Sequence, residues 1–155
     1  MIGNVLVVCV GNICRSPMAE GLLRQASINA KVTSAGLGAL VGQPADPISI
    51  KLMAEAGLDI SQHRARQLTR MDTREADLIL VMESDHKIEI QQRYPMAFGK
   101  VFRLGETDKF DIPDPYGQSR HAFEVALERI QHGVQAWVPR IRALLECTGS
   151  HSVGM

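Results

Sequence analysis

The stretch VLVVCVGNICRSPMAE, residues 5–20, contains the features that decide both the fold and the chemistry of this chain. Six consecutive apolar residues, Val5 to Val10, predict a strand that is buried on both faces. The next residues are abruptly polar, and we expect a helix to start there, with Ser16 as its cap and Pro17 in its first turn. Two of the three cysteines of the chain and an arginine fall within this stretch. We therefore take the end of this strand and the connection after it as the candidate functional region.

A strand followed by a helix is the pattern of the whole chain. We expect strands at residues 4–10, 31–35, 77–82 and 101–104, and helices at residues 16–26, 47–56, 84–93 and 119–146, with a kink at Pro139. Glycine- and proline-rich loops are expected at residues 36–47 and 105–118. Strands that alternate with helices and are apolar on both faces form a parallel sheet covered on both sides. We therefore predict one α/β domain over residues 1–147, followed by a polar C-terminal tail over residues 148–155.

The composition argues against several classes of protein. Seventeen basic and seventeen acidic residues give no net charge, and no basic run is present, so we expect no nucleic acid partner. No apolar stretch approaches the roughly 18 residues of a membrane span, so we expect no membrane insertion. The N-terminus lacks the basic residues and the long apolar run of a signal peptide, and we expect a cytoplasmic location. Three cysteines, an odd number, are better explained as free thiols than as a disulfide framework.

The residues that follow the first strand have the composition of an anion site. Backbone N–H groups at a helix N-terminus bind anions, and we expect Gly11 to supply the backbone angles that such a loop needs. Arg15 adds a planar fork that fits two phosphate oxygens. Cys9 enters this positive environment from the strand, so we expect a thiolate near neutral pH that attacks a phosphate monoester. Ser16 is placed to donate a hydrogen bond to that thiolate.

A plainer interpretation of the same residues stays open. A cysteine after a buried strand is usually an inert core residue, and a cysteine six positions before an arginine arises easily by chance. The buried strand before the loop and the Ser-Pro helix start after it favour the catalytic interpretation. A nucleotide-binding P-loop is excluded because the pattern G-x(4)-G-K-[ST] is absent.

A second motif, DIPDPYG at residues 111–117, supplies a candidate acid. Hydrolysis of a phosphate ester needs a group that protonates the leaving oxygen. Asp111 and Asp114 lie in one proline-stiffened loop after the fourth expected strand, and the prolines on both sides of Asp114 restrict its freedom. The alternative is a solvated turn, because Asp-Pro pairs are common in turns.

Taken together, VCVGNICRSPMAE at residues 8–20 and DIPDPYG resemble the low-molecular-weight protein tyrosine phosphatases, over about Val5 to Leu145. The segment SAGLGALVGQPADP, residues 34–47, is similar to the bacterial branch associated with exopolysaccharide or capsule tyrosine kinases. The resemblance implies a four-stranded parallel sheet flanked by helices. It also implies a phosphotyrosine protein as substrate, with an autophosphorylated bacterial tyrosine kinase as the expected partner, and inorganic phosphate or another oxyanion as a ligand of the loop. No metal or other cofactor is expected.

The resemblance also implies roles for individual residues. The nucleophile falls on Cys9, the phosphate-binding arginine on Arg15 and the general acid on Asp114, while Ser16 matches the hydroxyl that stabilises the thiolate. Asn12 matches a residue that a hydrogen-bond network holds in a strained conformation. The rest of the phosphate-binding loop is Val10, Gly11, Ile13 and Cys14, and the other network partners are Ser34 and His63.

Four further positions bear on the pocket and on redox chemistry. Leu40 stands near a position where eukaryotic members carry an aromatic residue, and Gly117 stands where they often carry a second tyrosine. Tyr116 remains as an aromatic pocket wall. Cys14 matches the second loop cysteine of the family. Its role is open between a small buried filler and a thiol that traps an oxidised Cys9 as a disulfide.

Three rival functions share part of this pattern. Arsenate reductases of the same fold need two further cysteines in the middle of the chain, and none lies between Cys14 and Cys147. Protein arginine phosphatases place a threonine where Ile13 stands, and a bulky apolar residue favours an aromatic phosphoester. A non-catalytic phosphotyrosine-binding module would have lost the nucleophile or the acid, and both are present. These observations favour a tyrosine phosphatase.

Overall fold

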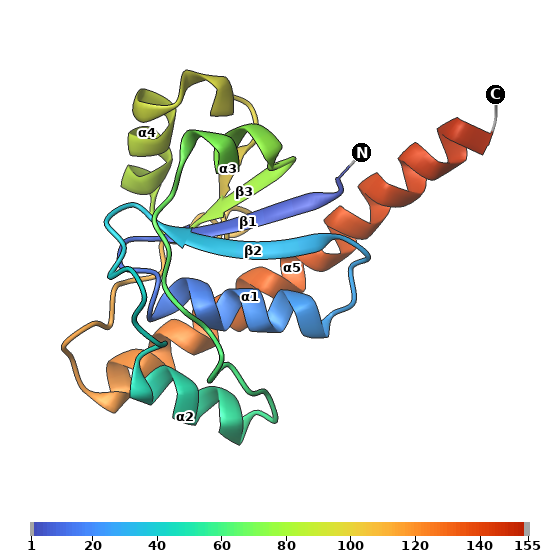
Figure 1. The fold of residues 1–155 in the computed structure, drawn as a ribbon. Helices are drawn as coiled ribbons and strands as arrows, with labels where there is room; N and C mark the ends of the chain where they lie inside the picture. The colour runs from blue at the N-terminus through green and yellow to red at the C-terminus, as the bar shows by residue number, and fades with distance from the viewer. Residues whose placement is uncertain (1, 154–155) are drawn as a thin grey trace.

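The structure, a computed structural model, describes residues 2–153, with side chains for residues 2–144. Its centre is a four-stranded parallel sheet with the strand order β2-β1-β3-β4 (Figure 1). The strands are β1 (Asn4–Cys9), β2 (Lys31–Gly36), β3 (Leu78–Val81) and β4 (Val101–Arg103). The predicted four-stranded parallel sheet is therefore confirmed, and each strand lies within a residue or two of its predicted range.

Helices cover both faces of this sheet (Figure 1). Helices α1 and α5 pack against each other on one face, α2 contacts both of them, and α3 and α4 lie on the other face. The helices are α1 (Arg15–Gln25), α2 (Pro47–Glu55), α3 (Arg70–Glu75), α4 (Ser84–Arg93), the 3₁₀ helix η1 (Pro95–Ala97) and α5 (Arg120–Val153). No helix in the described part of the chain is long and apolar enough to cross a bilayer.

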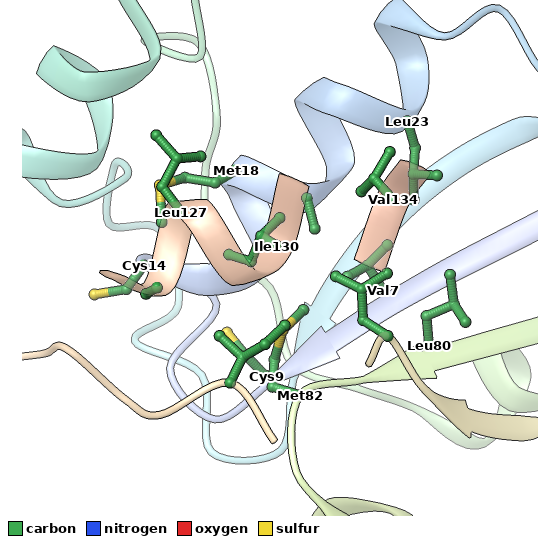
Figure 2. Packing of buried hydrophobic residues seen from close by; sticks show 14 of the residues in the cluster. Val7, Cys9, Cys14, Met18, Leu23, Leu80, Met82, Leu127, Ile130 and Val134 are labelled. Atoms are coloured by element: carbon green, nitrogen blue, oxygen red, sulfur yellow. The ribbon is translucent and has the colours of Figure 1, made fainter. Parts of the chain in front are cut away.

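The alternation of side chains along β1 divides the core into two layers. Val5, Val7 and Cys9 belong to the cluster beneath α1 and α5, which Figure 2 shows, whereas Leu6 and Val8 belong to the cluster on the α3 and α4 side. Successive side chains of a strand point to opposite faces of the sheet, so a strand between two helical layers must be apolar throughout. Cys9 is thus the last residue of a strand that is buried from Val5 onward.

Local sequence explains both ends of α2 and the start of α3. The side chain of Asp46 caps α2 by accepting a hydrogen bond from the Ile48 N–H at 2.9 Å, and Pro47 starts the helix. Gly57, with φ of 85°, follows its end in the left-handed region that glycine tolerates. Helix α3 was not predicted, although Thr69 and Asp72 form a capping box that starts it.

The C-terminal helix differs from the prediction in its length. Helix α5 continues through Pro139 and ends at Val153, not near residue 146. Residues 148–153, predicted as part of a polar tail, continue this helix, while residues 154 and 155 lie outside the described residues.

The strand order places the end of β1 at a reversal. The chain continues from β1 to β2 on one side, and β3 and β4 lie on the other side. Ligands of open α/β sheets bind at the carboxyl ends of the strands. They bind in the crevice that forms where one strand's connection leads to one side of the sheet and its neighbour's connection leads to the other side. Residues 9–16 occupy this place.

Candidate active site

Six of the eight residues of the phosphate-binding loop, residues 9–16, are buried, although the loop connects a strand to a helix. Asn12 and Ser16 are 0% exposed and Arg15 is 1% exposed. Gly36 at the end of β2 allows this close fit, because a Cβ atom there would lie 2.5 Å from the carbonyl oxygen of Val10. A connection that hides polar side chains in this way must satisfy their hydrogen bonds internally.

Cys9 forms one end of the loop. Its Sγ lies 2.9 Å from Oγ of Ser16, which comes back to it from the first turn of α1. The prediction that Ser16 caps this helix is wrong, because Arg15 is the first helical residue and Cys14 occupies the cap position without a side-chain hydrogen bond. The Ser16 hydroxyl is therefore directed to the thiol instead of to the helix backbone.

Asn12 carries the strained backbone of the loop. Its φ is 59°, in the left-handed region that residues other than glycine seldom adopt. The expectation that Gly11 supplies the special backbone angles is wrong, since Gly11 is not among the residues with a positive φ. Strain of this kind persists only where the surrounding structure holds it in place.

Four groups hold Asn12. Its side-chain amide donates to Oγ of Ser16 at 2.7 Å and to Oγ of Ser34 at 3.0 Å. Its side-chain oxygen accepts from the backbone N–H of Arg66 at 2.9 Å, and its carbonyl oxygen accepts from Nε2 of His63 at 2.7 Å. Together with the peptide chain on either side, these bonds tie the loop to α1, to β2 and to the segment before α3. Ser34 and His63 thus lie behind the loop and support it.

Arg15 offers one side of its guanidinium to the protein and leaves the other side free for an anion. Nη1 donates to Oε2 of Glu83 at 2.6 Å and to the carbonyl oxygen of Ile112 at 2.8 Å. Nε is buried and has no hydrogen-bond partner among the residues with described side chains. An unpaired buried N–H of a charged group costs free energy, and a phosphate oxygen would satisfy it.

The two aspartates of the DIPDPYG motif have different surroundings. Asp114 Oδ2 lies 3.8 Å from Nη2 of Arg15, and the side chain of Asp114 is 48% exposed. Asp111 instead accepts hydrogen bonds from the backbone N–H of Ser84 at 3.2 Å and from Arg103 at 3.2 Å. Asp111 therefore anchors the loop to β4 and α4, while Asp114 stays available for a proton transfer.

These side chains meet at one cavity of about 170 Å³. Cys9, Arg15 and Asp114 line it, and Ile13, Leu40 and Tyr116 add apolar wall. Leu40 is 42% exposed and Tyr116 57% exposed, so these two form the rim, whereas Ile13 is buried. The remaining lining residues are Val10, Gly11, Cys14 and Gly38. The cavity combines a thiol, a guanidinium group, a carboxylate and apolar walls.

A family model described as "Low molecular weight phosphotyrosine protein phosphatase" matches residues 4–146. The chain belongs to this family. It is 61% identical over 144 residues to "Probable low molecular weight protein-tyrosine-phosphatase EpsP" of Ralstonia nicotianae, covering 93% of this chain and 99% of that protein. It is 45% identical over 144 residues to "Low molecular weight protein-tyrosine-phosphatase Wzb" of Escherichia coli K12, covering 92% and 98%.

Similarity to a solved structure supports the assignment of the chain to this family. Wzb of Vibrio vulnificus in complex with benzylphosphonate superposes with a TM-score of 0.87 at 41% identity, covering 90% of this chain and 99% of that one. The resemblance recognised from the two motifs is thereby confirmed for the family, the fold and the enzyme class.

Cys14 is the second thiol of the loop and is 4% exposed. Burial raises the pKa of the Cys14 thiol, and the negative charge of Asp46 raises it further. Cys14 therefore stays protonated in the neutral range. Figure 2 shows that Cys14 and Cys9 belong to the same buried cluster.

Several residues of the phosphatase site were not predicted from the sequence. Glu83, which pairs with Arg15, is the second residue after the end of β3, and the carboxyl ends of neighbouring parallel strands share one edge of the sheet. That placement was a signal that could have identified Glu83. The contacts of Arg66 and His86 depend on tertiary packing and had no local signal. In the described part of the chain, no group of three His, Cys, Asp or Glu side chains is arranged to hold a metal ion.

Proposed function

We propose that this phosphatase hydrolyses phosphotyrosine through a phosphocysteine intermediate, with Cys9 as nucleophile, Arg15 as anion-binding group and Asp114 as proton donor. The observation that carries the proposal is the meeting of these three side chains at one cavity. The unpartnered Nε of Arg15 and the 2.9 Å contact between Cys9 and Ser16 support it.

In the first step, the Cys9 thiolate attacks phosphorus in line with the tyrosyl oxygen. The Sγ–P bond forms while the P–O bond breaks, and Asp114 transfers its proton to the leaving oxygen, so that tyrosine departs as a neutral phenol. Arg15 and the loop N–H groups hold the equatorial phosphate oxygens. Because the transition state is loose, most of the catalysis consists of positioning and charge stabilisation.

In the second step, water replaces tyrosine. Asp114, now a carboxylate, takes a proton from a water molecule that attacks phosphorus. An O–P bond forms, the Sγ–P bond breaks, and the Cys9 thiolate leaves with a hydrogen bond from Ser16. Release of inorganic phosphate restores the starting state, with the proton back on Asp114.

We further propose that the physiological substrate is an autophosphorylated tyrosine kinase of exopolysaccharide or capsule export, in the cytoplasm. The similarity to EpsP and Wzb supports this proposal. Ile13, Leu40 and Tyr116 favour an aromatic ring over the polar guanidino group of phosphoarginine, because apolar walls pack on a ring but leave guanidino N–H groups unpaired.

Two measurements test the function. Peptides of one sequence that carry phosphotyrosine, phosphoarginine or phosphoserine should give the highest kcat/KM for phosphotyrosine, and a preference for phosphoarginine would contradict the proposed substrate class. A purified autophosphorylated bacterial tyrosine kinase should lose its phosphotyrosine with the wild-type phosphatase and keep it with Cys9→Ser. Retention of phosphotyrosine with both proteins would exclude that kinase as a substrate.

A further inference from the structure

A buried histidine lies beside Glu83, the carboxylate that pairs with the anion-binding arginine. His86, in the first turn of α4, is 6% exposed. Its Nε2 lies 3.2 Å from Oε2 of Glu83, and its Nδ1 is buried without a hydrogen-bond partner among residues 2–144. Buried polar atoms are normally hydrogen-bonded, so a half-satisfied imidazole beside the site needs an explanation.

The contact with Glu83 fixes the tautomer of this ring. An ionised carboxylate only accepts hydrogen bonds, so Nε2 of His86 must carry the proton and Nδ1 the lone pair. Burial lowers the pKa of His86, and the charge of Arg15 lowers it further, against the opposing effects of Glu83, Glu89 and Asp111. The pKa of His86 is thus held below its ordinary value, which favours the neutral ring, and Nε2 lies beside the carboxylate of Glu83.

Glu83 uses a single oxygen for two partners. Oε2 accepts a hydrogen bond from Nη1 of Arg15 at 2.6 Å and lies 3.2 Å from Nε2 of His86. Glu83 is the N-cap residue of α4, but its side chain makes no capping hydrogen bond. The side chain is 32% exposed, so without a second partner it can turn to water or to the free N–H groups of α4. The histidine removes that freedom.

We propose that His86 is a positioning residue that holds the Glu83 carboxylate in place and thereby fixes the orientation of the Arg15 guanidinium for the phosphate. Nη1 of Arg15 is engaged by Glu83 and by the Ile112 carbonyl, which leaves Nε and Nη2 facing the anion. A guanidinium that binds phosphate in a bidentate manner depends on its orientation, because both of its N–H groups must align at once. The inference rests on the proposed role of Arg15.

The test uses inorganic phosphate as the probe and isothermal titration calorimetry as the readout, so that it does not depend on turnover. His86→Leu removes the donor and keeps an apolar side chain, whereas His86→Gln keeps an N–H donor of similar reach. We expect His86→Leu to weaken phosphate binding roughly 3- to 10-fold, the size of one lost hydrogen bond, and His86→Gln to recover most of this loss. The KM for an aryl phosphate should rise in parallel.

A double-mutant cycle with Glu83→Gln shows whether the effect passes through Glu83. In the Glu83→Gln background, His86→Leu should change the Kd of phosphate by less than about 2-fold, because the carboxylate that it positions is gone. If the double variant raises the Kd of phosphate by the product of the two single effects, the proposal is overturned. A His86→Leu variant that unfolds at a lower temperature but binds phosphate normally would also overturn it. If His86→Leu does not fold, His86→Asn, whose amide is too short to reach Glu83, takes its place in the cycle.

Arg15→Lys separates this proposal from the proposed function. It should weaken phosphate binding more than any His86 variant does. If Arg15→Lys binds phosphate as the wild type does, the anion-binding role of Arg15 is wrong and the role of His86 falls with it. If Arg15→Lys loses affinity while His86→Leu does not, the proposed function stands and only the positioning role is wrong.

Discussion

The two loops that meet at the active site are built in opposite ways. In the phosphate-binding loop, residues 9–16, Asn12 and Ser16 are fully buried and joined by side-chain hydrogen bonds. In the acid loop, residues 105–118, the side chains of Asp111 and Asp114 are 45% and 48% exposed. The acid loop is attached mainly through the contacts of Asp111 and the backbone of Ile112.

This difference matches the work proposed for each loop. The anion site must present charge and N–H groups in a fixed arrangement before phosphate arrives, since reorganisation during the reaction would raise the barrier. The acid must exchange protons with water once in each cycle, so a half-exposed carboxylate serves it better than a buried one. The predictions below test this division, from the largest expected effect to the smallest.

Cys9→Ser should abolish the hydrolysis of para-nitrophenyl phosphate while inorganic phosphate still binds. Serine has nearly the shape of cysteine but does not ionise near neutral pH, so the loop survives without its nucleophile. Cys14→Ser, in the same loop, is the matched control and should keep most of the activity. Sizeable turnover by Cys9→Ser would show that the reaction does not need the Cys9 thiolate.

Asp114→Asn should lower kcat by roughly 10²- to 10⁴-fold, the usual contribution of a general acid. The loss should shrink for aryl phosphates with good leaving groups, which need little protonation. Asp111→Asn is the matched control in the acid loop and should do much less, because Asp111 accepts hydrogen bonds from Ser84 and Arg103. Equal effects from the two substitutions, measured across a series of leaving groups, would overturn the choice of Asp114.

Asn12→Ala should destabilise the protein by about 1–3 kcal/mol more than Asn29→Ala does, because it leaves buried partners unsatisfied. Both asparagines have a positive φ, 59° and 56°, but Asn29 is exposed and Asn12 is held by Ser16, Ser34 and Arg66. The strain of a positive φ contributes to both variants, so the difference between them measures the contribution of the hydrogen-bond network. If both substitutions lower the free energy of unfolding, measured with denaturant, by the same amount, the network does not hold the loop.

Peroxide should inactivate the phosphatase reversibly, and bound phosphate should protect it. A thiolate at Cys9 is the form that peroxide converts to a sulfenic acid, and the thiol of Cys14 can trap that species as a disulfide. In Cys14→Ser, inactivation should persist but recovery with dithiothreitol should be largely lost. Peptide mass spectrometry should find a Cys9–Cys14 link in oxidised wild type, and full recovery of the variant would leave Cys14 as a packing residue.

Some parts of the fold and of the site can be predicted from the sequence, and others cannot. The run Val5–Val10 and the polar residues after it place the loop correctly, because an apolar strand and a helix start are local patterns. Gly11 was expected to carry the unusual backbone, yet Asn12 carries it, because bonds from distant segments hold its side chain. Such bonds depend on the tertiary fold and leave no mark in the local pattern.

Tertiary contacts also explain the residues that were missed. Glu83 and His86 become important only when β3 and β1 lie side by side and α4 packs behind Arg15. The Ser16 hydroxyl was expected to cap a helix, its commonest local use, but Cys9 and Asn12 take it instead. Helix α3 is a different case, because Thr69 and Asp72, three positions apart, are a local capping signal that is present in the sequence itself.

The central claim is that Cys9 becomes phosphorylated during turnover, and it can be observed directly in Asp114→Asn. With para-nitrophenyl phosphate the first step needs little help from an acid, whereas the second still needs a base, so the phosphoenzyme should accumulate. Rapid acid quenching followed by peptide mass spectrometry should then place one phosphoryl group on Cys9, with a matching burst of nitrophenol. A burst without phosphate on Cys9, or phosphate on Ser16 or Cys14, would contradict the account.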